Sequence, residues 1–154
     1  MHTLALGWVG GISLKNVTLT ANFYFMRGNF RLSEAVFPRD GAPLTTSQRM
    51  RLEPPQLDAL TARMRSETEF ALLFVTPSPE SPDPVSLADS FNKNFVRYLI
   101  EKQAAGIVRL TTGIIYLFPP CPFAFTHISS QFPDVVRSES DLKDYLLAVV
   151  FRSV

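Results

Sequence analysis

Prolines divide this sequence into short segments, and most of those segments have the residue pattern of a β-strand. Proline fixes its own backbone angle and lacks an N–H, so it does not fit the interior of a helix or of a central strand. The stretches 38–43 and 77–84 are therefore expected to be loops, and Pro119–Pro122 ends a further segment. Pro54 and Pro55 end one extended segment and suit the first turn of a helix.

Between these breaks, several stretches predict strands. The clearest is 17–25, in which apolar residues alternate with threonine, asparagine and tyrosine. The first stretch contains Gly10–Gly11, where we expect a bend or a bulge. The sequence 111–113 reads as the turn of a hairpin. The predicted strands are 4–14, 17–25, 30–37, 45–52, 69–76, 107–110, 114–118 and 145–151.

Two helices are predicted, over 55–66 and over 86–105. The longer one has Ser86 as its expected N-cap and Gly106 as the residue that follows its C-terminus. Its apolar stripe consists of Leu87, Phe91, Phe95 and Leu99. The aromatic segment 123–132 is compatible with either an irregular stretch or a short helix. About seven strands with about two to four helices in mixed order indicate an α+β fold with an antiparallel or barrel-like sheet.

The composition and the charge exclude several classes of protein. A chain of 154 residues fits one domain and can bury roughly two thirds of its unfolded surface without a disulfide or a metal. The single cysteine excludes an intramolecular disulfide, and two histidines leave few ligands for zinc. No apolar run approaches the roughly 20 residues that cross a bilayer. The formal net charge of +1 argues against a nucleic-acid module that depends on a broad basic surface.

Candidates for catalysis are few, and we predict a protein that is not an enzyme and uses no metal or cofactor. His127 lies close in sequence to Ser129, Ser130 and Asp134, but neither serine has the glycines of a nucleophile elbow around it. Cys121 stands between prolines in an apolar segment, and we interpret it as a small buried hydrophobic residue. The seven glycines include no phosphate-binding spacing of the GxGxxG or GxxxxGK type.

The near-neutral total conceals an uneven distribution of charge. Residues 1–66 carry eight basic and four acidic side chains, a net +4, whereas residues 67–154 carry seven and ten, a net −3. Arg49 and Arg51 are two apart in a predicted strand, so both side chains leave the same face. Tyr98 and Lys102 are four apart in the predicted long helix and share one helical face.

These four side chains would suit a phosphoserine, which carries about −1.5 to −2 charges and three acceptor oxygens. The spacing alone does not show whether the strand and the helix are neighbours. A pair of arginines on a solvated strand face therefore stays open as the alternative.

Several separated blocks, in order, resemble the SPOC domain of Spen-type transcriptional regulators. They are Gly7-Trp8 with Leu14-Lys15-Asn16, Gln48–Leu52 before the helix QLDALTARM, Tyr98-Leu99 followed by Lys102–Ile107, and Phe118–Cys121. The resemblance runs from about Leu4 to Val154 and so covers essentially the whole chain. The loops at 38–45 and 77–85 depart from the family's pattern.

The resemblance implies a distorted, mostly antiparallel β-barrel of about seven strands with peripheral helices. It also implies a monomeric, nuclear protein-interaction domain, the C-terminal fragment of a larger protein whose RNA-recognition domains lie elsewhere. Such domains recruit corepressors or other transcription-associated proteins by binding a phosphoserine segment. Carried over by position, the phosphopeptide site is Lys15, Arg49, Arg51, Tyr98 and Lys102, and Lys15 enters through the resemblance alone. Arg97 and Glu101 either adjust the choice of flanking residues or are simply solvated charges.

Two other functions remain open at this point. One is RNA binding by the basic N-terminal half with aromatic stacking, which would depend steeply on salt and not on serine phosphorylation. The other is a scaffold with an apolar groove for an unphosphorylated helix or strand, whose affinity would not change on removal of phosphate.

Overall fold

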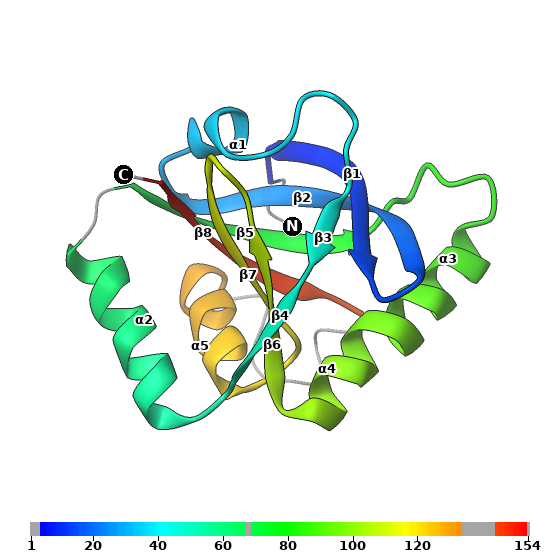
Figure 1. Cartoon of the computed structure of the whole chain (residues 1–154). Helices are drawn as coiled ribbons and strands as arrows, with labels where there is room; N and C mark the ends of the chain where they lie inside the picture. The colour runs from blue at the N-terminus through cyan, green and yellow to red at the C-terminus, as the bar shows by residue number, and fades with distance from the viewer. Residues whose placement is uncertain (1–3, 67–68, 134–143, 154) are drawn as a thin grey trace.

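Eight strands form one sheet that curls into a nearly closed barrel, with helices around it (Figure 1). The computed structural model describes residues 4–66, 69–133 and 144–153. The strands are β1 (Leu6–Leu14), β2 (Val17–Gly28), β3 (Leu44–Thr46), β4 (Gln48–Arg51), β5 (Phe70–Pro77), β6 (Ala104–Arg109), β7 (Gly113–Phe118) and β8 (Leu146–Arg152). Their order along the sheet is β3-β1-β2-β5-β8-β7-β6-β4, antiparallel except between β1 and β3. The α+β, barrel-like fold expected from the sequence is thereby confirmed.

One extended segment, which contains β3 and β4, joins the two ends of the sheet. β3 pairs in parallel with β1, whereas β4 pairs antiparallel with β6. Between them the backbone N–H of Ser47 donates to the carbonyl of Ile107 at 3.0 Å, so the chain changes partner within one residue. The sequence predicts a single strand over 45–52, and the structure divides it because its halves belong to opposite ends of the sheet. Counting the halves separately gives eight strands, where the resemblance implied about seven.

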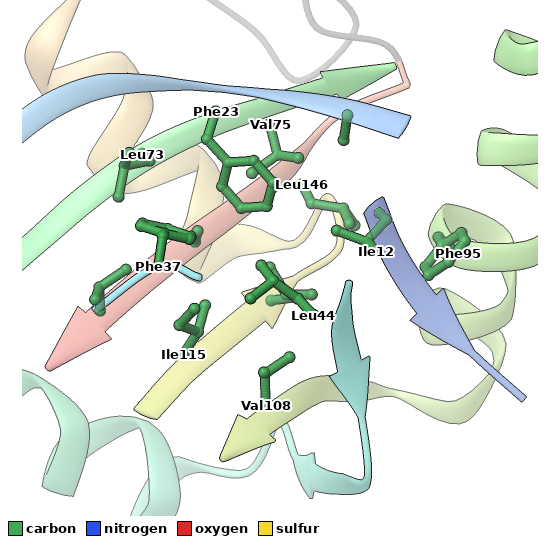
Figure 2. Close-up of a cluster of buried hydrophobic side chains, with 14 of the residues drawn as sticks. Ile12, Phe23, Phe37, Leu44, Leu73, Val75, Phe95, Val108, Ile115 and Leu146 are labelled. Atoms are coloured by element: carbon green, nitrogen blue, oxygen red, sulfur yellow. The ribbon is translucent and has the colours of Figure 1, made fainter. Parts of the chain in front are cut away.

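Large apolar side chains fill the interior of the barrel, as Figure 2 shows for Phe23, Leu44 and Ile115 among others. On β8 the buried side chains alternate, so that Leu146 points into the barrel and Leu147 packs on its outer face. Two helices cover that outer face, α2 (Pro54–Ser66) and α5 (Pro122–Gln131). The last strand is therefore buried on both faces, as its continuous apolar run predicted.

Most of the predicted elements are confirmed with small shifts in their bounds. This holds for α2, for the hairpin of β6 and β7, and for the loop that ends at α3 (Pro84–Phe91). The segment 123–132 is helical, which decides between the two alternatives that its sequence left open. None of the helices in the described ranges has the length and the apolarity to cross a bilayer.

The long helix predicted over 86–105 consists of α3, a π-helical turn η1 (Asn92–Val96) and α4 (Arg97–Lys102). Its buried side chains Phe91, Phe95 and Leu99 repeat every four residues. In a regular helix of 3.6 residues per turn such a stripe rotates by about 40° at each repeat. The π turn, with its wider hydrogen-bonded ring, takes up this rotation. All three side chains consequently point into the barrel, and none is more than 1% exposed.

Both ends of this helix differ from the prediction. The N-cap is Asp83 rather than Ser86, because the Asp83 carboxylate accepts a hydrogen bond from the Ser86 N–H at 3.1 Å and Pro84 takes the first helical position. At the other end Gln103 adopts the left-handed conformation (φ 50°, ψ 50°) and ends the helix. Gly106 is therefore not the terminating residue and lies inside β6.

The segment 30–37 was predicted as a strand, but it forms the short helix α1 (Leu32–Ala35). The side-chain oxygen of Asn29 accepts a hydrogen bond at 3.0 Å from the N–H two residues on, which turns the chain directly after β2. Leu32 and Val36, four residues apart, then point together into the barrel. The prediction was wrong because a short apolar stretch does not distinguish the two periodicities.

The irregularity in β1 lies between Leu6 and Trp8, where the register with β2 shifts, and not at Gly10–Gly11. The first of these glycines instead makes room for the indole of Trp8, which a side chain at that position would meet. That indole stacks on Phe37, with ring centroids 5.1 Å apart.

Removal of the N-cap should destabilise the fold modestly. We expect Asp83→Ala to lower the free energy of unfolding by about 1 kcal/mol, because the Ser86 N–H loses its acceptor. Asp83→Asn keeps a side-chain acceptor and should stay within a few tenths of wild type. Urea denaturation measures both, and equal losses for the two variants would contradict this assignment.

Candidate functional site

Three cationic side chains from three different elements surround the ring of Tyr98. Arg49 on β4 donates from its Nη1 to the Tyr98 hydroxyl at 3.0 Å. The Nζ of Lys15 lies 4.3 Å from the ring centroid, and the Nζ of Lys102 lies 5.8 Å from it. We call Lys15, Arg49, Tyr98 and Lys102 the Tyr98 cluster. Residue spacing had grouped Arg49, Tyr98 and Lys102, and the family resemblance had added Lys15; the structure brings these four side chains together.

Closure of the barrel places Lys15 and Arg49 beside each other. The parallel pairing of β1 with β3 sets Leu14 opposite Thr46, so the next residue of β1, Lys15, emerges beside the start of β4. Lys15 opens the two-residue turn between β1 and β2 with a left-handed backbone (φ 56°). Arg49 pairs with Gly106 of β6. A side chain at position 106 would come within 2.9 Å of Thr46.

Tyr98 lies half-buried at the edge of the barrel core. It precedes the fully buried Leu99 on α4, and its ring packs against the apolar residues inside the barrel. The packed ring fixes the position of its hydroxyl, and hence of Arg49. Lys102 follows one helical turn later on the same face.

No carboxylate of a described residue neutralises the charges of this cluster. Within the described ranges, no Asp or Glu oxygen lies within 4.0 Å of Lys15, Arg49 or Lys102. An exposed cation–π contact is worth about 0.5–1 kcal/mol and fades near 6 Å, so only the contact of Lys15 contributes substantially. The ring of Tyr98 therefore offsets only part of the repulsion between the three cations. Their positive charge, which no described carboxylate neutralises, is available to an anion.

The fifth predicted residue, Arg51, lies on the same face of β4 as Arg49 but has a different partner. Its guanidinium pairs with the carboxylate of Glu53 at 3.5 Å, and its side chain is 80% exposed. An exposed ion pair of this kind contributes about 0–1 kcal/mol. Arg51 is thus close enough in sequence to extend the Tyr98 cluster. Only a weak ion pair directs its side chain toward Glu53 instead.

Comparison with known proteins places the fold in a family. A family model described as "SPOC domain" matches residues 2–153. The chain belongs to the SPOC domain family. Its relatives are Spen-family proteins, as the sequence resemblance indicated, and domains of this family are protein-interaction modules of transcription regulators.

Two human relatives indicate how much of a longer protein the chain corresponds to. It is 36% identical over 153 residues to Msx2-interacting protein from Homo sapiens, and this match covers 93% of the chain and 4% of that protein. It is 30% identical over 174 residues to RNA-binding protein 15 from Homo sapiens, and this match covers 97% of the chain and 18% of that protein. The chain thus spans a small part of the relatives that it matches.

A solved structure supports the fold independently of sequence identity. The SPOC domain of human PHD-finger protein 3 superposes with a TM-score of 0.60 at 14% identity, and the match covers 97% of this chain and 98% of that one. At this identity the likeness concerns the fold alone.

An apolar groove of about 500 Å³ lies next to the Tyr98 cluster of this SPOC domain. The N–H of Leu52 donates to the carbonyl of Gln103 at 2.9 Å, which joins the residue after Arg51 to the residue after Lys102 at the edge of the groove. Its lining comprises Leu52, Leu57, Ile100, Gln103, Phe123 and the segment Pro119–Pro122. Ile100 is 45% exposed there, although it is a large apolar residue. The sequence did not predict this groove. The one feature that could have indicated it is the proline-rich segment Pro119–Pro122, which lines the groove.

The two serines near His127 in sequence use their hydroxyls on backbone carbonyls. The hydroxyls of Ser129 and Ser130 donate to carbonyls of their own helix, those of Thr126 and His127. Asp134 lies outside the described residues. Cys121 is half-buried in the lining of the groove. In the described part of the chain no three His, Cys, Asp or Glu side chains are placed to hold a metal ion.

Arg97 and Glu101 are exposed on α4, and neither forms an ion pair with a described residue. Both readings of this pair, as a selector of flanking residues and as solvated charge, therefore stay open.

His127 should make the stability of this SPOC domain depend on pH. Burial, and secondarily the Arg27 guanidinium 3.3 Å from its Nδ1, lower the pKa of His127 below the usual 6.5. The unfolded chain therefore takes up this proton first, so the stability from a neutral His127 is full above pH 6.5 and is lost as the pH falls through the folded pKa. The urea midpoint of wild type should drop more between pH 7.5 and 5.5 than that of His127→Gln. Parallel curves would refute this role.

Proposed function

We propose that this SPOC domain binds phosphoserine segments of transcription-associated nuclear proteins through the Tyr98 cluster and Arg51, and thereby recruits corepressors or other regulatory proteins. One observation carries the proposal: Lys15, Arg49 and Lys102 converge on Tyr98 without a described carboxylate to neutralise them. Phosphoserine supplies the missing charge in compact form, as three oxygens that carry about −1.5 to −2.

Each side chain has a defined task in this proposal. Arg49 presents a planar fork that matches two phosphate oxygens, and the Tyr98 hydroxyl orients it. That hydroxyl accepts from Arg49 and keeps its own hydrogen for donation to the phosphate. Lys15 and Lys102 add positive charge near the same ring. Arg51 can leave Glu53 for the phosphate, because an exposed ion pair costs at most about 1 kcal/mol to break.

The rival function, RNA binding, is less well supported by this geometry. Binding of single strands depends on aromatic faces on which bases stack. The ammonium of Lys15 lies over the ring of Tyr98 at 4.3 Å, so a base would have to displace a cation from it. The cations also gather around one ring, which suits a single phosphate better than a nucleic-acid backbone.

Removal of the arginines should abolish the dependence on phosphate. The probe is a labelled peptide pool with one fixed phosphoserine and randomised flanks, titrated beside the same pool without phosphate and beside single-stranded RNA. A charged hydrogen bond is worth about 1.5–3 kcal/mol, so Arg49→Ala should weaken binding of the phosphorylated pool by about tenfold or more. Arg51→Ala should cost less, because Glu53 competes for this residue in the free protein.

Arg39→Ala is the matched control for this experiment. Arg39 forms an exposed ion pair with Glu34, also at 3.5 Å, outside the Tyr98 cluster. It should bind like wild type, and all variants should keep the wild-type melting temperature. Wild-type affinity of the Arg49→Ala/Arg51→Ala double variant for the phosphorylated pool would rule out this site.

The Tyr98 hydroxyl should matter separately from its ring. Tyr98→Phe keeps the packed ring but removes the acceptor of Arg49 and one donor, so affinity for the phosphorylated pool should fall about three- to tenfold. Tyr24→Phe is the control, since the Tyr24 hydroxyl accepts a comparable bond from Asn22 at 3.1 Å. Equal affinity of both variants in fluorescence anisotropy would show that the hydroxyl takes no part.

A further inference from the structure

The end of β5 and the loop that follows it contain every pair of a hydroxyl residue and a proline in the sequence. The three pairs are Thr76-Pro77, Ser78-Pro79 and Ser81-Pro82. A serine or threonine directly before proline is the pattern that proline-directed protein kinases recognise, so this part of the chain offers three sites for phosphorylation. The pattern alone does not choose among them.

The sheet holds the first two hydroxyl residues. Thr76 lies in β5 opposite Asn22 of β2, and β5 pairs on its other side with β8. The N–H of Ser78 donates to the carbonyl of Thr20 at 3.1 Å, and Ser78 is only 5% exposed. A kinase takes its target residue in an extended segment that enters the active-site cleft. Thr76 or Ser78 would therefore first have to leave the sheet.

Ser81 lies beyond the sheet and is held weakly. Its N–H donates to the carbonyl of Ser78 at 3.4 Å, and its Oγ accepts from the N–H of Asp83 at 3.3 Å. Both distances exceed the usual range of a protein hydrogen bond. Residues 79–80 and 82–86 are exposed, and Ser81 is partly exposed between them. The proline that follows Ser81 disfavours a helical backbone there and favours the extended one that a kinase binds.

We propose that Ser81 is a phosphorylation site for a proline-directed serine kinase. The kinase transfers the γ-phosphoryl group of ATP to Ser81. A bond forms between the Ser81 Oγ and the γ-phosphorus, the bond from that phosphorus to the bridging oxygen breaks, and ADP leaves with this oxygen. A base of the kinase accepts the hydroxyl proton. Pro82 has no N–H, so the residue after Ser81 needs no hydrogen-bond acceptor in the cleft of the kinase.

A phosphate on Ser81 lies far from the Tyr98 cluster of the same molecule. Figure 1 shows the loop beyond the N-terminal end of α3, at the opposite end of this helix from α4. From Pro84 to Tyr98 the helix advances by about 20 Å, at roughly 1.5 Å per residue. The screening length at physiological salt is about 8 Å, so the phosphate changes the field at the cluster little. Phosphorylated Ser81 is thus a phosphoserine that another molecule can bind and its own Tyr98 cluster cannot.

The test compares the folded domain with a synthetic peptide of residues 73–86, which contains the same three pairs without the sheet. A panel of proline-directed kinases is first tried on the peptide, and those that phosphorylate Ser81 are used on the domain, with the sites located by tandem mass spectrometry. Ser81 of the domain should react within about threefold of its rate in the peptide. Thr76 and Ser78 should react at least tenfold more slowly than Ser81. Failure of the whole panel at Ser81 of the peptide or of the domain, or an equal rate at Ser78 of the domain, would overturn the assignment.

Two proline variants show whether the kinase recognises the pair Ser81-Pro82. Pro82→Ala should lower phosphate incorporation at least tenfold, and Ser81→Ala should abolish it. Pro79→Ala is the matched control, because it removes the proline after Ser78 and leaves that after Ser81, and it should react like wild type. All three positions lie in the loop, so the melting temperature should stay as in wild type. Equal rates for Pro82→Ala and Pro79→Ala would contradict the proposal.

A final titration separates this site from the proposed function. The domain phosphorylated on Ser81 should bind the phosphoserine pool within about twofold of the unmodified domain. A larger change would show that the modified loop acts on the Tyr98 cluster, against the placement argued above. Failure of the unmodified domain to bind the pool would contradict the proposed function and leave the phosphorylation of Ser81 unaffected. The two failures are therefore distinguishable.

Discussion

The double pairing of the segment 44–51 is the constraint on which the rest of this structure depends. Its first half closes one edge of the sheet against β1 and its second half closes the other edge against β6. Backbone hydrogen bonds fix both registers, and a slip of one residue would turn every side chain to the opposite face. Met50 would then leave the outer apolar layer, and Arg49 would be directed into it. The energy that closes the barrel therefore also holds the arginines of β4 in position.

Local backbone irregularities place the remaining members of the Tyr98 cluster. Lys15 and Gln103 have left-handed backbones, which cost non-glycine residues about 1–3 kcal/mol each and persist only where the surroundings impose them. The left-handed conformation of Gln103 is imposed by the hydrogen bond from the Leu52 N–H to its carbonyl and by the start of β6 at the next residue. The π turn keeps Phe95 and Leu99 in the core, so that Tyr98 reaches the surface beside them with its ring still packed.

The sequence predicted those parts of the site that depend on short-range periodicity. A spacing of two in a strand and of four in a helix placed Arg49 beside Arg51 and Tyr98 beside Lys102. Whether the two pairs meet depends on long-range register, which no local pattern encodes. Lys15 stands in a turn without periodicity, and therefore only the family resemblance could suggest it. The same physical limit explains the mistaken strand at 30–37, where an asparagine turn outweighed an ambiguous apolar pattern.

The net charge of the whole chain gives no indication of the Tyr98 cluster, because acidic residues elsewhere reduce the total to +1. Screening explains why this total decides little: at physiological salt the field of an exposed charge fades over about 8 Å. The local field at the Tyr98 cluster is thus set by the few charged side chains that form it, and acids farther away lower the formal net charge more than they lower this field. A domain built in this way attracts polyanions weakly as a whole, yet it can present a local group of cations of the size of one compact anion.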